Sequence, residues 1–498
     1  MTDDAPATGL TELHARRFLT TDAARPEKVA RWHAKGRRTA RENIADLVDP
    51  GSFVEYGRFI TAAQEGRRDL ADLVVETPAD GIIGGTATIA GKPCAVLSYD
   101  YLVMAGTQGM RGHRKSDRLL ETVKRMRLPT VFFTEGGGGR PGDTDIPLVS
   151  ALDVESFALW GELEGVVPRI AVVSGRCFAG NAVLAGCADL RIATPDANLG
   201  MAGPAMIAGG GLGTFAPEEI GPVSDHIANG VIDILVDDEA AAVAAVRDLF
   251  SCLETPAESG DAVDQDELRS LLPDNDREGF DVRPVVESLA DTDSVTWLRE
   301  GFAPELVTAL ARIDGIPVGV IANQSTHLAG ALTSDASVKG ADFLALCGRW
   351  DLPVVSLVDT PGFMVGPDAE RTGLVRHASR MVVAGAQLST PLVGVILRRG
   401  YGLGAQAMLG GSTHRPLITV AWPDAHLGPM GLEGAVRLSM AGELAALPED
   451  EREERVAALT EEYRKQASAL NAARMHEIDD VIDPAETRAV IAATLRRA

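Results

Sequence analysis

The residues with the clearest chemical potential in this chain are glycines that follow predicted strands. They occur in four stretches, two in each half of the chain: residues 135–140 (EGGGGR), 175–181 (GRCFAGN), 359–363 (DTPGF) and 400–406 (GYGLGAQ). A glycine-rich turn from a strand into a helix leaves backbone N–H groups free at the helix start, where they stabilise an anion. Two such groups that converge hold the oxygen of a thioester enolate. The pattern therefore favours oxyanion stabilisation by the backbone.

A competing interpretation is that these glycines only allow a helix to pack tightly against a strand. Two paired sets at equivalent places in the two halves favour the oxyanion interpretation. The four-glycine run does not match the pattern GxxxxGK[ST], so a nucleotide-binding P-loop is not expected. Residues 209–213 (GGGLG) are also glycine-rich and are predicted to form a flexible loop near the ligand.

An internal repeat relates the two halves at an offset of 224 residues. At this offset residues 89–96 match 313–320, Lys115 matches Lys339, residues 128–131 match 352–355, and Gly180 matches Gly404; after four more residues of shift, 195–200 match 423–428. Single matches of this kind arise by chance in sequence rich in Gly and Ala. Their common order over more than a hundred residues predicts a tandem duplication.

Short apolar, β-branched runs alternate with helix-like stretches in both copies. The predicted strands are 94–98, 130–134, 170–174, 318–322, 354–358 and 392–397, and the helices between them include 116–126 and 340–347. This alternation predicts an α/β fold with mostly parallel sheets. Ligands of such sheets bind at the carboxyl ends of the strands, which is where the glycine turns lie.

Length, composition and charge limit the domain organisation and the classes of function. Its length exceeds what one hydrophobic core supports, and the acidic, proline-bearing tract 255–279 predicts an exposed linker. We therefore expect an N-terminal domain at 1–255, a linker at 256–282 and a C-terminal domain at 283–498. With 47 Lys and Arg against 71 Asp and Glu, the net charge of -24 argues against nucleic acid and anionic membranes as partners.

The five cysteines are scattered and form no CxxC pair, so neither a structural zinc site nor a disulfide framework is expected. No signal peptide and no apolar run of about 18 residues is visible, so the protein is expected to be cytoplasmic. One basic cluster stands out, containing Arg111, Arg114 and Lys115. It could receive the phosphates of coenzyme A, or it could be an ordinary solvated helix start.

Longer runs of sequence resemble a known family. Residues 175–189 (GRCFAGNAVLAGCAD) are similar to the oxyanion segment of the crotonase superfamily. The chain from about residue 27 onward resembles the carboxyltransferase (beta) subunits of propionyl-CoA and related biotin-dependent acyl-CoA carboxylases. The matching runs include TARENIADLVDPGSFVEYG, DGIIGGTATIAGKP, SLVDTPGFMVG and AWPDAHLGPMGLEGAV. The resemblance implies a tandem duplication of a crotonase-like (ββα superhelix) domain.

The resemblance also implies a mechanism that uses few catalytic side chains. The first copy holds the acyl-CoA and the second holds carboxybiotin, which releases CO2; the ureido nitrogen then removes the α-proton of a short acyl-CoA, and the enolate attacks CO2. By motif position, the first oxyanion site uses the amides of Ala179 and Gly180 with Gly137 and Gly138 alongside, and the second uses Leu403 and Gly404 supported by Gly362. No metal is implied.

Some residues depart from the family pattern. Family members usually have Gly-Gly at Ala179-Gly180 and Gly-Ala at Leu403-Gly404, and many carry a substrate-selecting Asp at the position of Gln406, which leaves the acyl specificity open. The chain contains no biotinylation pattern of the Met-Lys-Met type and no ATP-grasp region. Biotin is therefore expected on a separate carrier, together with a biotin carboxylase. The resemblance further implies a hexamer with each active site between the first copy of one chain and the second copy of another.

Two other functions remain open at this point. A biotin-independent crotonase-type hydratase or decarboxylase would need a pair of carboxylates as general acid and base, for which the sequence offers Glu135, Glu218, Glu219 and Glu433. A catalytically silent structural subunit of a carboxylase would be consistent with the departures at Leu403 and Gln406.

Overall fold

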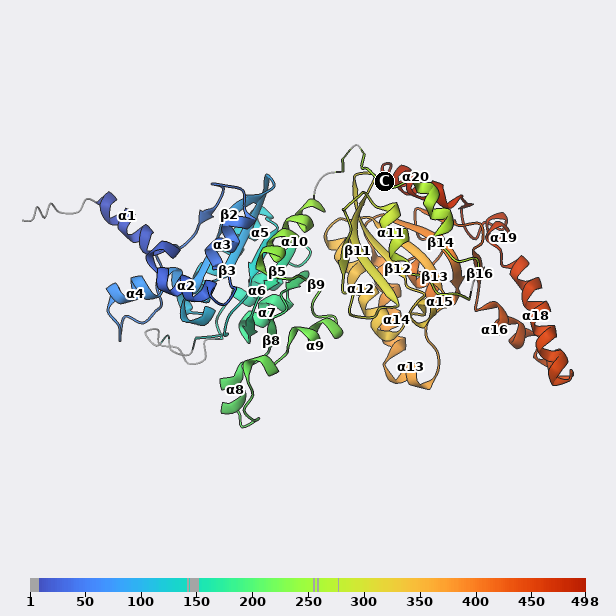
Figure 1. Cartoon of the computed structure of the whole chain (residues 1–498), viewed down its shortest axis with the longest axis horizontal. Coiled ribbons are helices and arrows are strands. Elements are labelled where there is room, and N and C mark those ends of the chain that lie inside the picture. The colour runs from blue at the N-terminus through green and yellow to red at the C-terminus, as the bar shows by residue number, and fades with distance from the viewer. Residues whose placement is uncertain (1–8, 141–142, 144–151, 254–255, 258, 276) are drawn as a thin grey trace, which may run out of the picture. The chain divides into compact units, whose positions relative to one another are not determined.

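The computed structural model describes residues 9–140, 143, 152–253, 256–257, 259–275 and 277–498. The chain divides into two compact units, unit 1 (Met1–Ser251) and unit 2 (Cys252–Ala498), and each unit combines one large sheet with surrounding helices (Figure 1). The predicted α/β fold class is confirmed.

The large sheet of unit 1 has seven strands in the order β1-β2-β3-β4-β5-β7-β9. Its first three strands pair antiparallel and the others pair parallel. A separate two-stranded sheet joins β6 and β8 in parallel. The bounds are β1 Val54–Glu55, β2 Ile82–Ile89, β3 Lys92–Tyr99, β4 Thr130–Phe133, β5 Arg169–Val173, β6 Arg176–Phe178, β7 Leu190–Ala193, β8 Asn198–Gly200 and β9 Ile234–Leu235.

Local sequence signals explain some of the helices of unit 1. Helix α3 starts with a capping box in which the Thr39 side chain and Glu42 satisfy each other's backbone N–H groups, and α5 buries Leu119, Leu120 and Val123 on one face. The helices are α1 Gly9–Leu19, α2 Pro26–His33, α3 Ala40–Leu47, α4 Leu70–Glu76, α5 Met110–Met126, α6 Ser156–Gly161, α7 Gly180–Gly186, α8 Pro204–Gly209, α9 Val223–Ala228 and α10 Glu239–Ser251, with 3-10 turns at Asp22–Ala24, Pro78–Gly81, Met104–Gly106 and Pro217–Glu219.

Unit 2 repeats this plan. Its sheet runs β10-β11-β12-β13-β14-β15-β17, and β16 also pairs with β14. The strands are β10 Thr296–Leu298, β11 Leu306–Ile313, β12 Ile316–Asn323, β13 Val354–Thr360, β14 Leu392–Tyr401, β15 Ile418–Ala421, β16 His426–Gly428 and β17 Asp480–Val481. The helices are α11 Arg283–Leu289, α12 Ser334–Arg349, α13 Pro367–Arg371, α14 Leu374–Gln387, α15 Gly402–Met408, α16 Leu432–Ser439, α17 Ala441–Ala445, α18 Glu449–Gln466, α19 Ala469–Arg474 and α20 Thr487–Leu495, with 3-10 turns at Gln265–Ser270, Leu328–Gly330 and Pro484–Glu486.

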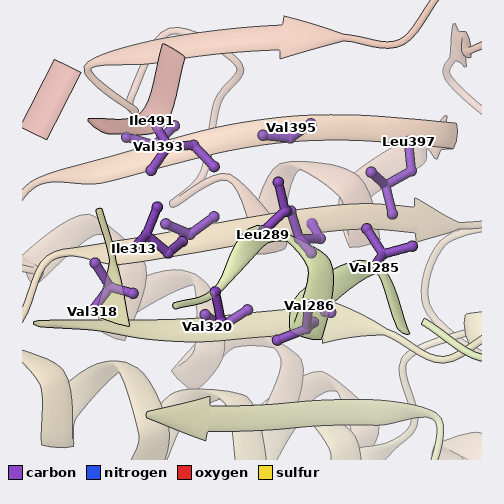
Figure 2. Close-up of a cluster of buried hydrophobic side chains, with 14 of the residues drawn as sticks. Val285, Val286, Leu289, Ile313, Val318, Val320, Val393, Val395, Leu397 and Ile491 are labelled. Atoms are coloured by element: carbon purple, nitrogen blue, oxygen red, sulfur yellow. The ribbon is translucent and has the colours of Figure 1, made fainter. Parts of the chain in front are cut away.

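The core of unit 2 lies between its sheet and the helices α11 and α20. Figure 2 shows β-branched residues of β12 and β14, such as Val320 and Val395, facing Leu289 of α11. Burial of these apolar surfaces drives the packing. Leu268 and Phe280 belong to the same core, although both lie in the segment 256–282 that the sequence predicted to be an exposed linker. Leu268, Phe280 and Val282 therefore attach this segment to the core of unit 2, whereas Val263 and most of the polar residues described in the segment are exposed.

The backbone dihedral angles also show the duplication. Residues with positive φ recur at the offset of 224: Ala90 and Asp314 (49° and 52°), Ala105 and Ala329 (55° and 54°), Arg127 and Asp351 (53° and 56°), and Gly138 and Gly362 (86° and 122°). Positive φ is uncommon in residues other than glycine, so a shared series of such positions is a strong sign of one fold used twice.

Candidate active site

The first glycine turn leads from β6 into α7. Ala179 adopts φ 51° and ψ -121°, and its N–H donates to the carbonyl oxygen of Gly200 at 2.8 Å. Gly180 is the first residue of α7, and its N–H has no hydrogen-bond acceptor among the described residues. Of the predicted donors Ala179 and Gly180, the structure therefore leaves only Gly180 free, because the Ala179 amide joins the turn to β8.

The four-glycine loop lies against this turn. A Cβ added at Gly138 would be 2.7 Å from the Cβ of Ala179. The Gly137 N–H donates to Ala105 O at 3.1 Å, and the Gly138 N–H donates to Oδ1 of Asn181 at 3.0 Å. These two predicted contributors therefore hold the loop in place. In the described part of the chain, the Gly139 N–H has no acceptor, which makes it the available loop donor beside α7.

The second glycine turn leads from β14 into α15, and its register corrects the sequence comparison by one residue. Phe178 pairs with Gly200 in unit 1, while Tyr401 pairs with Gly428 in unit 2. Phe178 and Tyr401 are thus equivalent, two residues before Gly180 and Leu403. The offset is 223 here, so Gly180 corresponds to Leu403 and not to Gly404.

The consequences for unit 2 follow from this register. Gly402, like Ala179, has positive φ, at 61°. Leu403 has a side chain that is 69% exposed, and its N–H finds no acceptor within the described ranges. Gln406 is also exposed and lies one helical turn further along α15. Gly404 is buried, and a Cβ there would lie 2.7 Å from Cα of Gly362.

The loop of unit 2 matches the four-glycine loop. The Leu332 N–H donates to Gly362 O at 3.0 Å, as the Gln108 N–H does to Gly138 O at 2.7 Å. The Gly362 N–H donates to Oγ1 of Thr360 at 3.1 Å, so Gly362 supports the loop. Phe363, the counterpart of Gly139, has an N–H without an acceptor in the part of the chain that the structure describes.

Each loop is held by one polar side chain, but that side chain comes from the helix start in unit 1 and from the loop itself in unit 2. In unit 1 the Asn181 amide accepts from the loop and donates to Gly106 O at 3.4 Å, and Gly136 leaves room for it. In unit 2 the Thr360 hydroxyl accepts from the loop and donates to a glycine carbonyl at 2.7 Å, and Gly404 carries no side chain. Thr360 is the counterpart of Gly136, and Gly404 is the counterpart of Asn181. The polar side chain and the glycine have therefore exchanged places between the loop and the helix start.

An acidic residue precedes each loop and is bound by arginine. Arg37 lies 3.0 Å from Oε2 of Glu135, and Asp359 pairs with Arg398 at 3.0 Å and Arg399 at 2.7 Å. Burial raises the pKa of Glu135 to about 8, against the opposing effect of Arg37. A Cβ added at Gly175 would be 2.4 Å from Oε1 of Glu135. The carboxyl group therefore faces the start of β6, whereas Gly180 follows its end.

The other acidic candidates have partners of their own. Glu218 pairs with Arg176 at 2.8 Å, Glu219 accepts from the Ala216 N–H at 2.6 Å, and Glu433 pairs with Arg437 at 2.8 Å. The described residues place no pair of these carboxylates at either turn. The partners of these carboxylates give no support to a hydratase or decarboxylase mechanism.

The basic cluster does not form one site. Lys115 is buried, and its Nζ donates to Ile82 O at 2.5 Å; its counterpart Lys339 is buried in the same way and donates to Phe302 O at 2.8 Å. Arg111 pairs with Glu65 at 2.6 Å, while Arg114 is exposed. Lys115 is thus structural, and its assignment to phosphate binding is wrong because its ammonium group is directed into the protein.

Two structural features are absent from the residues that the structure describes. No helix among them is long and apolar enough to cross a membrane. They contain no group of three or more His, Cys, Asp or Glu side chains arranged to hold a metal ion.

Comparison with known proteins identifies the class. A family model described as "Carboxyl transferase domain" matches residues 31–498. The chain is 34% identical to the methylmalonyl-CoA carboxyltransferase 12S subunit of Propionibacterium freudenreichii subsp. shermanii, covering 94% of this chain and 90% of that protein. It is 31% identical to the propionyl-CoA carboxylase carboxyltransferase subunit of Haloferax mediterranei, covering 97% and 95%. This chain belongs to the carboxyl transferase family.

Solved structures agree. A single-chain, multi-domain long-chain acyl-CoA carboxylase is 49% identical to this chain, with a TM-score of 0.93. The match covers 98% of this chain and 49% of that protein, so this chain spans about half of its length. The transcarboxylase 12S structure is 31% identical with a TM-score of 0.87, covering 100% of this chain and 96% of that one. The protein is an acyl-CoA carboxyltransferase of the biotin-dependent class, and the predicted duplication of a crotonase-like domain is confirmed.

Proposed function

We propose that this chain transfers a carboxyl group from carboxybiotin, borne on a separate carrier, to the α-carbon of an acyl-CoA. Unit 1 binds the acyl-CoA and unit 2 binds the carboxybiotin. The division between the units follows the family resemblance. The observation that most directly supports two oxyanion sites is the pair of turns, each of which offers, within the described residues, a free N–H at a helix start beside a loop with a second free N–H. Both turns are built to receive an oxygen atom that carries negative charge.

In unit 1 the proposed donors are the amides of Gly180 and Gly139. They hold the thioester oxygen and stabilise the negative charge that develops there when the α-proton leaves. A single donor of this kind is worth about 10²–10³-fold in kcat. Ala179, Gly137 and Gly138 contribute indirectly, because their amides hold the turn and the loop in place.

In unit 2 the proposed donors are the amides of Leu403 and Phe363, which fit the ureido oxygen of biotin. When bound, carboxybiotin supplies both the CO2 and the base for the reaction. Gly404 and Gly362 allow α15 and the loop to approach each other closely. The side chains of Leu403 and Gln406 project from this turn and contribute to the surface that the carrier meets.

The proposed partners are a biotin carboxylase and a biotin carrier on other polypeptides. The 12S relative is described as a hexamer, and we extend that assembly to this chain, with each active site between unit 1 of one copy and unit 2 of another. The proposed setting is the cytoplasm, which is consistent with a long chain that contains only five scattered cysteines.

A reconstitution assay tests the proposal. The chain is mixed with a biotinylated carrier, its carboxylase, ATP, labelled bicarbonate and a series of acyl-CoAs. Label should reach the acyl-CoA only when the carrier is present. Turnover without the carrier would indicate a hydratase or decarboxylase, and complex formation without any transfer would indicate a silent structural subunit.

A further inference from the structure

Two side chains stand directly beside the proposed thioester donor Gly180. A Cβ added at Gly180 would lie 2.3 Å from Oε1 of Gln108 and 3.0 Å from Cζ of Phe157. Neither residue lies in a glycine-rich turn, and neither supplies one of the proposed backbone donors. Together they form a wall beside Gly180, in which Gln108 is the polar side and Phe157 is the aromatic side.

The aromatic side of this wall is held firmly. Ser156, which begins α6 immediately before Phe157, has its Oγ 2.9 Å from Nδ1 of His113 and also donates to Asp117. The imidazole of His113 in turn lies against the Phe157 ring, with ring centroids 6.1 Å apart. At the next turn of α6, Trp160 donates to Leu184 O on α7 at 2.8 Å. The Phe157 ring is therefore fixed relative to both α5 and α7.

The polar side is held equally well. Nε2 of Gln108 donates to the hydroxyl of Tyr99 at 3.0 Å, and both residues are buried. That bond directs Oε1 of Gln108 toward Gly180. Tyr99 is itself stacked on Phe132, with ring centroids 5.4 Å apart. The amide oxygen is thus a fixed acceptor at the edge of the site.

The chemistry of an acyl-CoA distributes its parts along this wall. When the thioester oxygen binds Gly180, the acyl carbons and the pantetheine arm diverge from the same trigonal carbonyl carbon. The arm carries amide N–H groups, which an acceptor such as Oε1 of Gln108 suits. The acyl chain is apolar, which an aromatic ring suits.

We propose that Phe157 is a specificity-determining residue whose ring closes the acyl pocket on the unit 1 side and limits the length of the acyl chain. This inference rests on the proposed function of Gly180. Phe157 lies outside the glycine motifs. The packing of α6 against α7 brings it to Gly180.

The test compares Phe157→Ala, Phe157→Leu and Phe157→Trp with the unchanged chain. Phe18→Ala is the matched control, because Phe18 lies on the exposed surface of α1. Dissociation constants for acetyl-, butyryl- and octanoyl-CoA are measured by calorimetry without any carrier, and kcat/KM for the same thioesters is measured in the reconstituted system. Thermal melting confirms that each variant is folded.

Removing the ring should favour the longer chain. One methylene is worth roughly 10–200-fold in an apolar pocket, so Phe157→Ala should raise the octanoyl-to-acetyl ratio of kcat/KM at least about tenfold. Phe157→Leu should give a smaller rise, and Phe157→Trp should lower the ratio. Phe18→Ala should leave it unchanged.

Failure of this inference is distinguishable from failure of the proposed function. If folded Phe157→Leu and Phe157→Trp both keep the acyl-length profile of the unchanged chain, in binding and in turnover, Phe157 does not limit chain length. If the unchanged chain carboxylates no acyl-CoA, the proposed function fails, and the carrier-free binding series still tests whether Phe157 selects among thioesters.

Discussion

The two glycine turns share a backbone frame and differ in nearly every side chain that maintains it. Asn181 holds the loop of unit 1 and Thr360 holds the loop of unit 2, from opposite partners of the contact. The surface presented to the ligand differs as well, since Gly180 is enclosed by Gln108 and Phe157 whereas Leu403 projects into solvent. The comparison teaches that the backbone donors are the common requirement, while the side chains adapt each turn to its own ligand.

The largest expected effect comes from removing the bare backbone at Gly180. Gly180→Val should lower kcat/KM for acyl-CoA by about 10²-fold or more, because any side chain meets Gln108 and Phe157 and blocks the donor. Gly186→Val is the matched control on the same helix, since a Cβ there meets nothing within 4 Å. Activity of a folded Gly180→Val protein close to that of the control would remove Gly180 from the oxyanion site.

The exchanged loop supports allow the two units to be separated kinetically. Asn181→Ala and Thr360→Val each leave a buried loop N–H without its acceptor, which costs about 1–3 kcal/mol. Asn181→Ala should raise KM for acyl-CoA by about tenfold, and Thr360→Val should raise KM for the biotinylated carrier by a similar factor. Steady-state kinetics with each substrate varied in turn provides the measurement. A rise in the same KM for both variants would contradict the division of labour between the units.

The two buried lysines provide a comparison in stability. Burial lowers the pKa of Lys339 to about 7, although Glu305 opposes it, and lowers that of Lys115 to about 8. The unfolded chain therefore binds more protons than the folded chain between each lowered pKa and the ordinary lysine pKa near 10.4. Lys339 thus makes stability rise with pH from about pH 7, and Lys115 does so from about pH 8.

Replacing Lys339 should flatten this rise. Lys339→Met should reduce the slope of the free energy of unfolding against pH, between pH 7 and 10, by up to about 1.4 kcal/mol per pH unit. Lys115→Met should act over the narrower range that begins near pH 8. Urea unfolding at several pH values measures the slopes, and curves parallel to those of the unchanged chain would show that both lysines are already neutral or remain charged throughout.

The smallest expected effect is at the exposed surface of α15. Gln406→Asp adds a charge one turn from Leu403 and should change the ratio of kcat/KM between short and long acyl-CoAs by about fivefold or less, since exposed charges contribute about 1 kcal/mol at most. A kinetic series over acyl length measures it. An identical profile would exclude Gln406 from the acyl pocket and leave selection to unit 1.

The sequence was sufficient to predict the duplication, the principal strands and the location of both turns. Glycine patterns and apolar runs are local signals, and the offset of 224 could be counted directly. The identity of the free amides could not be predicted, because the Ala179 N–H is occupied by Gly200 from another strand. The one-residue change of offset at the second turn was also invisible, since Gly180 and Gly404 match by type and only strand pairing shows that they are not equivalent. Phe157 carried no signal, because its role depends on how α6 packs.

The exchange between Asn181 and Thr360 also has a consequence for inheritance. Repeated segments of a gene tend to become uniform when one copy overwrites the other. Here such a transfer would place an asparagine at position 404, where even a Cβ would lie 2.7 Å from Cα of Gly362, or a threonine at position 136, where it would lie 2.2 Å from Gly106 O. Backbone spacing therefore opposes a transfer confined to one of these positions, so the loop and the helix start of each half can change only together.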